Sequence, residues 1–226
     1  MMTIVPVDIH THNLLQTPGT AIVNYYPEEF TPQEGGWYSV GIHPWRVHSS
    51  FEDSMQAGRL AIQNEAERMF SRELVAHPQV LAIGEAGLDK LIDTPVHVQI
   101  KVFEYQARLA DEIGKPLIIH LVRAVDELLK LKQTLRPSVP WIIHGFRGKP
   151  ALAQEFLRHG FYLSFGEKYQ ADALRTIPSG CLFLETDESR IPITELYQCA
   201  AKVRGISLEQ LEETIRENIG KVFFKR

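Results

Sequence analysis

Histidines and carboxylates follow short apolar runs throughout this sequence, and they are the side chains with the clearest chemistry. The first run ends in the stretch DIHTH at 8–12, and four later runs each lead to an ionisable residue. Ionisable groups are costly to bury unless they are paired or bind a metal. Such a series of side chains at strand ends therefore predicts a metal site. The six predicted ligands are His10, His12, Glu85, His120, His144 and Asp187.

Histidine and carboxylate ligands suit Zn, Mn, Co, Ni or Fe better than Mg, which prefers oxygen ligands; the sequence leaves the identity of the metal open. Six ligands exceed what one tetrahedral ion requires, and a carboxylate can bridge two ions. We therefore predict two divalent metal ions. Two such ions can activate a water and stabilise the attacking and leaving oxygens of a hydrolysis. The alternative is that each histidine is simply a buried polar residue with a backbone partner.

Short runs rich in Val, Ile and Leu predict the strands that position these residues. Their nearly continuous apolar character is typical of parallel strands that are covered on both faces. The predicted strands are residues 4–9, 37–42, 80–83, 116–119, 140–143, 161–165 and 181–184.

Segments with helical periodicity lie between these strands. One of them stops at Gly114-Lys115-Pro116, a glycine past the helix end followed by a proline that opens the next strand. A capping box of Ser207 and Gln210 marks the start of the last helix. The predicted helices are residues 58–76, 95–113, 124–135, 151–159, 171–177 and 194–203, and one that begins at Ser207.

Strands that alternate with helices predict an α/β fold with a parallel sheet. An open doubly wound sheet and a closed (β/α) barrel of the TIM type are the two alternatives. The barrel is favoured because the polar residues come from many successive strand ends, and because no glycine-rich turn follows the first strand. The chain of 226 residues shows no internal repeat and no linker, so we predict one domain over residues 1–226.

Composition predicts the surroundings in which the protein works. We find no apolar stretch long enough to span a membrane and no secretory signal, and the only two cysteines, Cys181 and Cys199, indicate the cytoplasm. The formal net charge of −4 argues against a long nucleic-acid groove. Residues 115–175 carry 10 Lys/Arg against 5 Asp/Glu, which suits a compact anionic ligand or simply reflects solvated helix faces.

Longer motifs show that the chain resembles the TatD-like family of metal-dependent hydrolases over nearly its whole length. The resemblance implies an amidohydrolase-type barrel and a divalent-metal-dependent phosphoesterase, of the deoxyribonuclease kind that acts at DNA ends. Fewer residues than usual in the family separate His12 from Gly41, so we expect an irregular barrel with a shortened first β/α unit. The matching stretches are DIHTH at 8–12, GIHP at 41–44, IGEAGLD at 83–89, PLIIH at 116–120, HGFRG at 144–148 and LETD at 184–187.

The resemblance also implies roles for the predicted ligands. Asp187 and Glu85 would be catalytic, with Glu85 bridging the two ions and Asp187 orienting or deprotonating the attacking water. One ion would be held by His10, His12, Glu85 and Asp187, and the other by Glu85, His120 and His144.

Basic and aromatic residues beside these motifs are candidates for substrate binding. Arg147 and Arg123 each follow a predicted ligand, and guanidinium groups match phosphate oxygens; neutralising nearby carboxylates is the alternative. His43 contacts either the substrate or a polar neighbour. Trp45 beside it either packs in the ordinary way or stacks on a base. Asp89 is either structural or holds a ligand histidine in one tautomer.

Two other functions stay open at this stage. The same centre could hydrolyse an amide or a lactone, although Glu85 stands where many amidohydrolases carry a carboxylated lysine, which favours the phosphoesterase. A degenerate barrel that acts as a binding module is the alternative from another class, and the complete set of six ligands argues against it. The sequence is compatible with a monomer or a small homo-oligomer and with no membrane partner.

Overall fold

Eight parallel strands form the centre of the molecule. The structure, a computed structural model, describes residues 7–47 and 70–225. Each strand pairs with the next one along the chain, so the sheet order is the sequence order. The strands are β1 (Asp8–Thr11), β2 (Ala21–Tyr25), β3 (Trp37–Val40), β4 (Val80–Asp89), β5 (Leu117–Val122), β6 (Trp141–Ile143), β7 (Phe161–Phe165) and β8 (Leu182–Leu184).

The first and last strands meet and bring the sheet close to a full circle. A parallel bridge joins Thr11 at the end of β1 to Asp187, three residues beyond β8. The backbone N–H of Asp187 donates to the carbonyl of His10 at 2.9 Å, and that of His12 donates to the carbonyl of Asp187 at 3.0 Å. The predicted TIM-type barrel is therefore confirmed, as a nearly closed barrel of eight strands.

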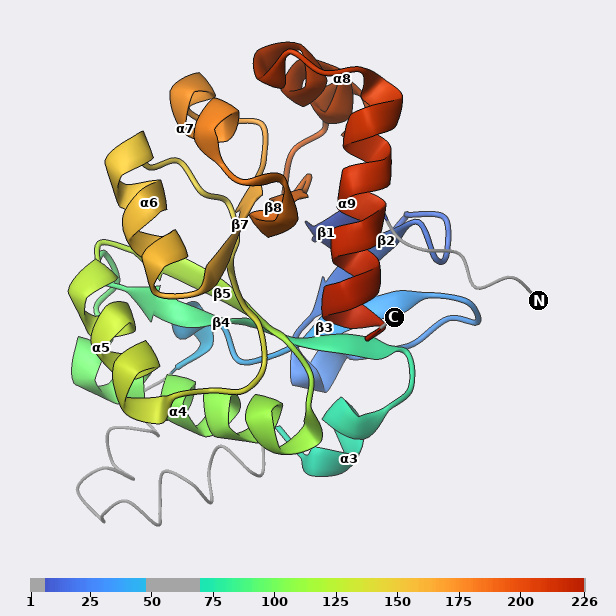
Figure 1. Cartoon of the computed structure of the whole chain (residues 1–226). Helices are drawn as coiled ribbons and strands as arrows, with labels where there is room; N and C mark the ends of the chain where they lie inside the picture. The colour runs from blue at the N-terminus through green and yellow to red at the C-terminus, as the bar shows by residue number, and fades with distance from the viewer. Residues whose placement is uncertain (1–6, 48–69, 226) are drawn as a thin grey trace, which may run out of the picture.

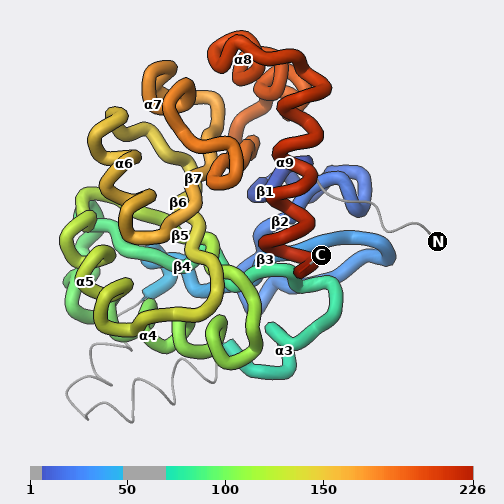
Figure 2. The backbone as a smooth tube through the Cα atoms, viewed as in Figure 1, coloured from blue at the N-terminus to red at the C-terminus, as the bar shows by residue number. Residues whose placement is uncertain are grey.

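Helices lie around the outside of the strands (Figure 1), and the backbone trace shows the same enclosure (Figure 2). The left-handed Gly114 ends α4, and Ser207 and Gln210 form the predicted capping box of α9. The helices are α3 (Arg72–Ala76), α4 (Val96–Ile113), α5 (Val125–Leu135), α6 (Pro150–Arg158), α7 (Ala171–Thr176), α8 (Ile193–Arg204) and α9 (Leu208–Phe223), with short 3-10 turns η1 (Pro27–Glu29), η2 (Pro44–Arg46) and η3 (Ser179–Cys181).

The beginning of the barrel corrects the sequence-based prediction. The seven predicted strands omitted β2, which occupies Ala21–Tyr25. The first β/α unit is shortened, as predicted. It keeps its strand, β1, but no helix follows before β2. Residues 12–20 join β1 to β2 without a helix, and residues 26–36, which lead to β3, hold only the turn η1.

Strand ends differ from the prediction where the backbone extends beyond the apolar run. The predicted strand 80–83 continues to Asp89, so Glu85 lies inside β4 rather than at its end. The register with β5 shifts between Ile83 and Ala86, which re-aims the side chains there. The first part of the predicted strand 4–9 and most of the predicted helix 58–76 lie outside the described residues.

The core consists of apolar side chains from the strands and from the inner faces of the helices. Trp141 of β6 is fully buried and packs edge-on against Phe103 of α4, with ring centroids 5.3 Å apart. At the end of α9, Phe223 packs on Phe183 of β8, and Phe224 packs on Trp37 of β3. The end of α9 thus contacts the strands on either side of β1 and β2.

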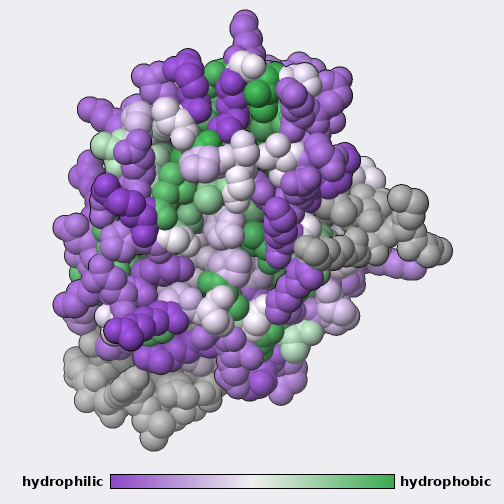
Figure 3. All heavy atoms as spheres, in the orientation of Figure 1, coloured by the Kyte–Doolittle hydropathy of each residue, from purple (hydrophilic) through white to green (hydrophobic). Residues whose placement is uncertain are grey.

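The outer surface is mainly hydrophilic on the face seen in Figure 3, with apolar residues showing between the helices. Within the described residues, no helix combines the length and the apolar character that a membrane crossing would need.

Gly87 in β4 lies in close contact with the neighbouring strand. A Cβ atom at this position would overlap the backbone oxygen of His120 in β5. Two strand backbones cannot separate locally without losing ladder hydrogen bonds, so Gly87→Ala should lower the free energy of unfolding by about 1–3 kcal/mol. Denaturant titration of the purified variant measures this difference.

Gly220 in α9 is the matched control for this substitution. A Cβ atom there would meet nothing within 4 Å, and alanine favours a helix over glycine. We expect Gly220→Ala to be as stable as the natural protein or slightly more stable. Equal unfolding midpoints for the natural protein and Gly87→Ala would contradict the contact between β4 and β5.

Candidate metal centre

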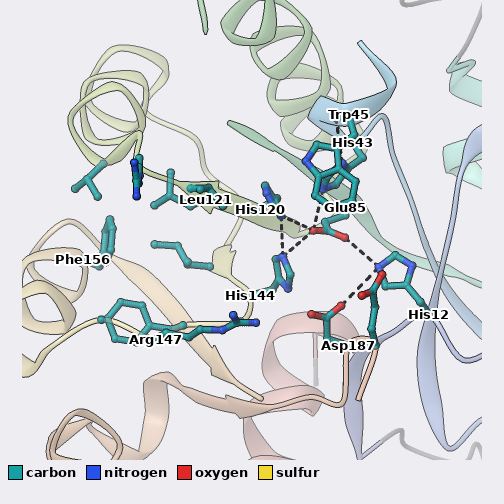
Figure 4. A pocket seen from close by; sticks show the side chains of 18 of the residues that line it. His12, His43, Trp45, Glu85, His120, Leu121, His144, Arg147, Phe156 and Asp187 are labelled. Atoms are coloured by element: carbon teal, nitrogen blue, oxygen red, sulfur yellow. Dashed lines mark hydrogen bonds and ion pairs between the residues drawn. The ribbon is translucent and has the colours of Figure 1, made fainter. Parts of the chain in front are cut away.

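Glu85 lies at the middle of a cluster of histidines at the carboxyl ends of the strands (Figure 4). Its oxygen Oε2 faces the end of β1, 3.3 Å from His10 Nε2 and 3.2 Å from His12 Nε2. The two imidazoles come from alternate residues, so both reach the same side of the strand. One carboxylate oxygen of Glu85 thus contacts both imidazoles of the predicted His-x-His pair.

The other oxygen of Glu85, Oε1, faces three histidines from other strands. It lies 2.9 Å from His120 Nδ1, 2.7 Å from His144 Nε2 and 3.3 Å from His43 Nε2. His120 belongs to β5, His144 follows β6 and His43 follows β3. Glu85 therefore stands between two separate groups of ring nitrogens, one at each oxygen.

Asp187 lies on the β1 side of the cluster. Its Oδ1 is 3.8 Å from His10 Nε2 and 3.8 Å from His12 Nε2, and its side chain is 27% exposed. The residue has a positive φ of 54°, and its backbone is fixed by the bridge to β1. Aspartate tolerates this left-handed conformation better than most residues. The carboxylate is thereby held at the mouth, facing His10 and His12.

The donor atoms fit divalent metal ions better than they fit one another. His10 is fully buried, and neither of its ring nitrogens makes a hydrogen bond of acceptable geometry. A carboxylate offers about four lone-pair sites, yet five imidazoles crowd around Glu85. Among the described residues, three sets of donor atoms lie close enough together to hold an ion: His10, His12 and Glu85; His10, His144 and Asp187; and His43, Glu85 and His120.

Further carboxylates fix the tautomers of two of these histidines. Glu185 accepts from His144 Nδ1 at 3.1 Å, so that in the neutral ring the lone pair lies on Nε2, toward the centre. Asp89 accepts from His120 Nε2 at 3.3 Å, which leaves Nδ1 toward Glu85. The structure therefore contains the second of the two alternatives for Asp89, a carboxylate against a histidine of the predicted ligand set.

His43 is oriented in the opposite sense. Its Nδ1 accepts a hydrogen bond from the backbone N–H of Trp45 at 3.1 Å. In a neutral ring the proton then sits on Nε2, which faces Glu85 Oε1. This geometry makes His43 a hydrogen-bond donor to Glu85, a contact that the GIHP motif did not reveal.

Burial and neighbouring charges act against each other in this cluster. Burial opposes the charged form of Glu85, but His144 and the other histidines hold the pKa of its carboxyl well below the usual value. Burial likewise opposes the charged form of His144, yet the carboxylates of Glu85 and Glu185 raise its pKa well above the usual value. Burial lowers the pKa of His43. The carboxylates thus favour positive charge here, as a cation site requires.

Asp8 holds the two ends of the barrel in place beneath the histidines. Its carboxylate accepts from the backbone N–H groups of His10 at 3.2 Å and Thr186 at 3.1 Å, and from the Thr186 hydroxyl at 2.6 Å. Burial raises the pKa of Asp8 to about 7. One buried side chain therefore links the backbone of β1 just before His12 to the backbone just before Asp187.

A pocket of about 580 Å³ opens above the cluster and contains the predicted substrate-binding residues. Arg123, Arg147 and His43 all line it, together with Trp45. In Figure 4 the guanidinium of Arg147 lies on the side of His144 and Asp187. Both arginines are exposed. The pocket therefore combines an acidic and imidazole-rich floor with two cationic side chains.

Two contacts of the site were not predicted from the sequence: that of Glu185 with His144 and that of His43 with Glu85. Glu185 precedes Asp187 by two residues in the LETD motif, and the only sign of its role in the sequence was a charged residue at the end of an apolar run. The contact of His43 with Glu85 needs the fold, because β3 and β4 are joined by a long connection. The six predicted ligands lie together: four of the histidines contact Glu85, and Asp187 faces two of them.

A comparison with known families matches one described as TatD related DNase over residues 28–224. Among curated relatives, the chain is 37% identical over 132 residues to the uncharacterized metal-dependent hydrolase YabD of Bacillus subtilis, covering 54% of this chain and 52% of YabD. It is 31% identical over 172 residues to the human 3'-5' RNA nuclease TATDN2, covering 71% of this chain and 21% of that protein.

Among solved structures, the TatD homologue YJJV of Escherichia coli has a TM-score of 0.74 at 19% identity, with 99% of each chain covered. This likeness supports the fold. The chain spans about half the length of YabD and about a fifth of TATDN2.

Proposed function

This chain belongs to the family of TatD-related DNases, and from that membership and the geometry of its site we propose that it is a metal-dependent hydrolase that cleaves phosphodiester bonds at the ends of nucleic-acid strands. The observation that carries the proposal is the position of Glu85. Its two oxygens face two different groups of imidazoles, at 3.2–3.3 Å on one side and 2.7–3.3 Å on the other. That arrangement supports a carboxylate shared by two ions.

We assign one ion to the β1 side of Glu85 and a second to the opposite side. Bound divalent ions act as Lewis acids and lower the pKa of a bound water molecule toward neutral pH. His43 keeps Glu85 in place through its Nε2–H, and Glu185 and Asp89 orient His144 and His120. His10, His12, Glu85 and Asp187 would hold the first ion, and Glu85, His120 and His144 would hold the second.

The remaining roles belong to residues at the mouth of the pocket. Asp187 is proposed to accept the proton of the attacking water, since its carboxylate is partly exposed and faces His10 and His12. Arg147 and Arg123 are proposed to bind phosphate oxygens, because both line the pocket and carry fixed charge.

The wider setting follows from the same proposal. The substrate is a DNA or RNA end, in keeping with the family description and with the RNA nuclease among the relatives. We further propose a single domain over residues 1–226, a monomer or small homo-oligomer, and a cytoplasmic location, which the two unpaired cysteines support.

Removing and restoring metal tests this function. The purified protein is stripped with a chelator, reloaded separately with Zn, Mn, Co, Ni, Fe or Mg, and assayed on single-stranded DNA and RNA labelled at one end. Nitrophenyl phosphates and a lactone serve as comparison substrates. We expect the stripped protein to be inactive and the reloaded protein to shorten labelled strands from an end. Turnover of the lactone alone would contradict the phosphodiesterase, and full activity after stripping would contradict metal dependence.

Glu185 gives a test of the ligand assignment away from the ions themselves. The residue is fully buried and accepts from His144 Nδ1 and from the backbone of Gly145. Glu185→Gln should weaken metal binding by about 10–100-fold, because the partner that orients His144 loses its charge. Titration of the stripped protein with metal measures the affinity.

Glu167 provides the control, since it is exposed on the neighbouring loop and accepts only from Ser189 Oγ among the described contacts. Glu167→Gln should bind metal as the natural protein does. Unchanged affinity in Glu185→Gln would remove His144 from the ligand set.

A further inference from the structure

Trp45 is the aromatic side chain most open to solvent at the metal centre. It belongs to η2, just after β3, and it lines the pocket above Glu85. The residue is 58% exposed, whereas Trp141 is fully buried and Trp37 is only partly exposed. An indole that lines a pocket and is open to solvent offers a large, rigid aromatic face to a ligand.

The exposed ring is also held in a fixed orientation. Its Nε1–H donates to Asp89 Oδ2 at 2.9 Å, and the same oxygen lies 3.3 Å from His120 Nε2. The indole packs edge-to-face with His43, with centroids 4.9 Å apart and planes at 86°. Figure 4 shows Trp45 and His43 together beside Glu85. A ring fixed in this way loses little freedom when a ligand stacks on it.

From these contacts we propose that Trp45 is the stacking platform for a nucleobase next to the scissile phosphate. The inference rests on the proposed nuclease function and adds a substrate contact to it. Aromatic side chains bind unpaired bases by stacking, without regard to their sequence, because every base has a π-face. Trp45 would therefore favour single-stranded ends, whose bases are free to leave their neighbours.

A structural role through Asp89 is the competing explanation, and two substitutions separate the two. Trp45→Phe keeps an aromatic ring and removes the N–H that reaches Asp89. Trp45→Ala removes both. Leu91→Ala is the control, because Leu91 is 62% exposed and its backbone is bonded to Asp89 Oδ1, while it is not among the described residues that line the pocket.

Each variant is assayed, with metal restored, on a single-stranded oligonucleotide and on the same strand with abasic residues at both ends. We expect Trp45→Ala to lower kcat/KM about 5- to 150-fold on the base-bearing strand, mainly through KM, and to change the abasic strand less than about twofold. Trp45→Phe and Leu91→Ala should retain most activity. Equal losses on both strands, or a loss in Trp45→Phe as large as in Trp45→Ala, would overturn the proposal.

Tryptophan fluorescence gives a second readout that does not depend on turnover. A phosphorothioate oligonucleotide should quench the emission of the natural protein, its abasic counterpart should not, and Trp45→Phe should show no quenching. If the natural protein cleaves no strand but base-dependent quenching occurs, the nuclease proposal fails, whereas the binding of a base by Trp45 is still supported. If strands are cleaved but bases make no difference to cleavage or quenching, the role of Trp45 fails alone.

Discussion

Replacing Glu85 with glutamine should abolish hydrolysis and prevent the binding of the two proposed metal ions. The amide keeps the shape of the carboxylate but loses the negative charge that five imidazoles surround. Metal ions contribute several kcal/mol of transition-state stabilisation, so the loss should reach at least about 10³-fold in kcat/KM. Metal analysis of the dialysed variant should accordingly find far less than one ion per chain.

Glu213→Gln is the matched control for Glu85→Gln. Glu213 lies on α9 and forms an exposed pair with Arg216, so its replacement should leave metal content and activity unchanged. Circular dichroism and thermal unfolding establish whether Glu85→Gln is folded. A folded Glu85→Gln protein that still carries two ions per chain would contradict the bridging role of this residue.

Asp187→Asn should leave the fold intact and reduce kcat by about 10²–10⁴-fold, the range for loss of a general base. The fold should survive because the backbone at Asp187 has a positive φ that asparagine also tolerates, and because its bridge to β1 uses main-chain atoms. The rate should fall because the amide cannot accept a proton from water. Steady-state kinetics with metal restored measures the change.

Asp172→Asn serves as the corresponding control, since Asp172 is exposed on α7 and pairs with Arg175. It should retain full activity. The metal content of Asp187→Asn should also be unchanged, because three other donors remain on the β1 side. Natural rates in a folded Asp187→Asn protein would exclude Asp187 from proton transfer.

Helix positions could be predicted because their ends carry local signals. Gly114 adopts the left-handed conformation that only glycine takes easily, and α4 ends there as the sequence indicates. Ser207 and Gln210 satisfy the first backbone donors of α9 without any tertiary contact. These interactions lie within a few residues of one another, so the sequence alone contains them.

The strand β2 escaped prediction because its neighbours give no helical signal. Its five residues AIVNY are apolar enough for a strand, but the pattern of alternating strands and helices predicts a helix on each side, and residues 12–20 and 26–36 contain no α-helix. The strand is fixed instead by parallel pairing with β1 and β3. Such pairing depends on tertiary structure, so it cannot be predicted from the sequence of the short segment alone.

The convergence of the six candidate ligands could be predicted because strand ends converge in any parallel barrel. The orientation of each ring could not, because it depends on partners distant in the sequence. His144 is oriented by Glu185, and Glu85 accepts a hydrogen bond from the Nε2–H of His43. Trp45 likewise acquires its fixed position only when β3 and β4 bring it to Asp89.

A crystal structure of the protein grown with Mn²⁺, with anomalous scattering measured at the manganese edge, tests the central claim most directly. Two peaks about 3.5–4 Å apart are expected. One should lie between Glu85 Oε2, His10 and His12, and the other between Glu85 Oε1, His120 and His144. A single peak, or two peaks that do not share Glu85, would contradict the two-metal centre.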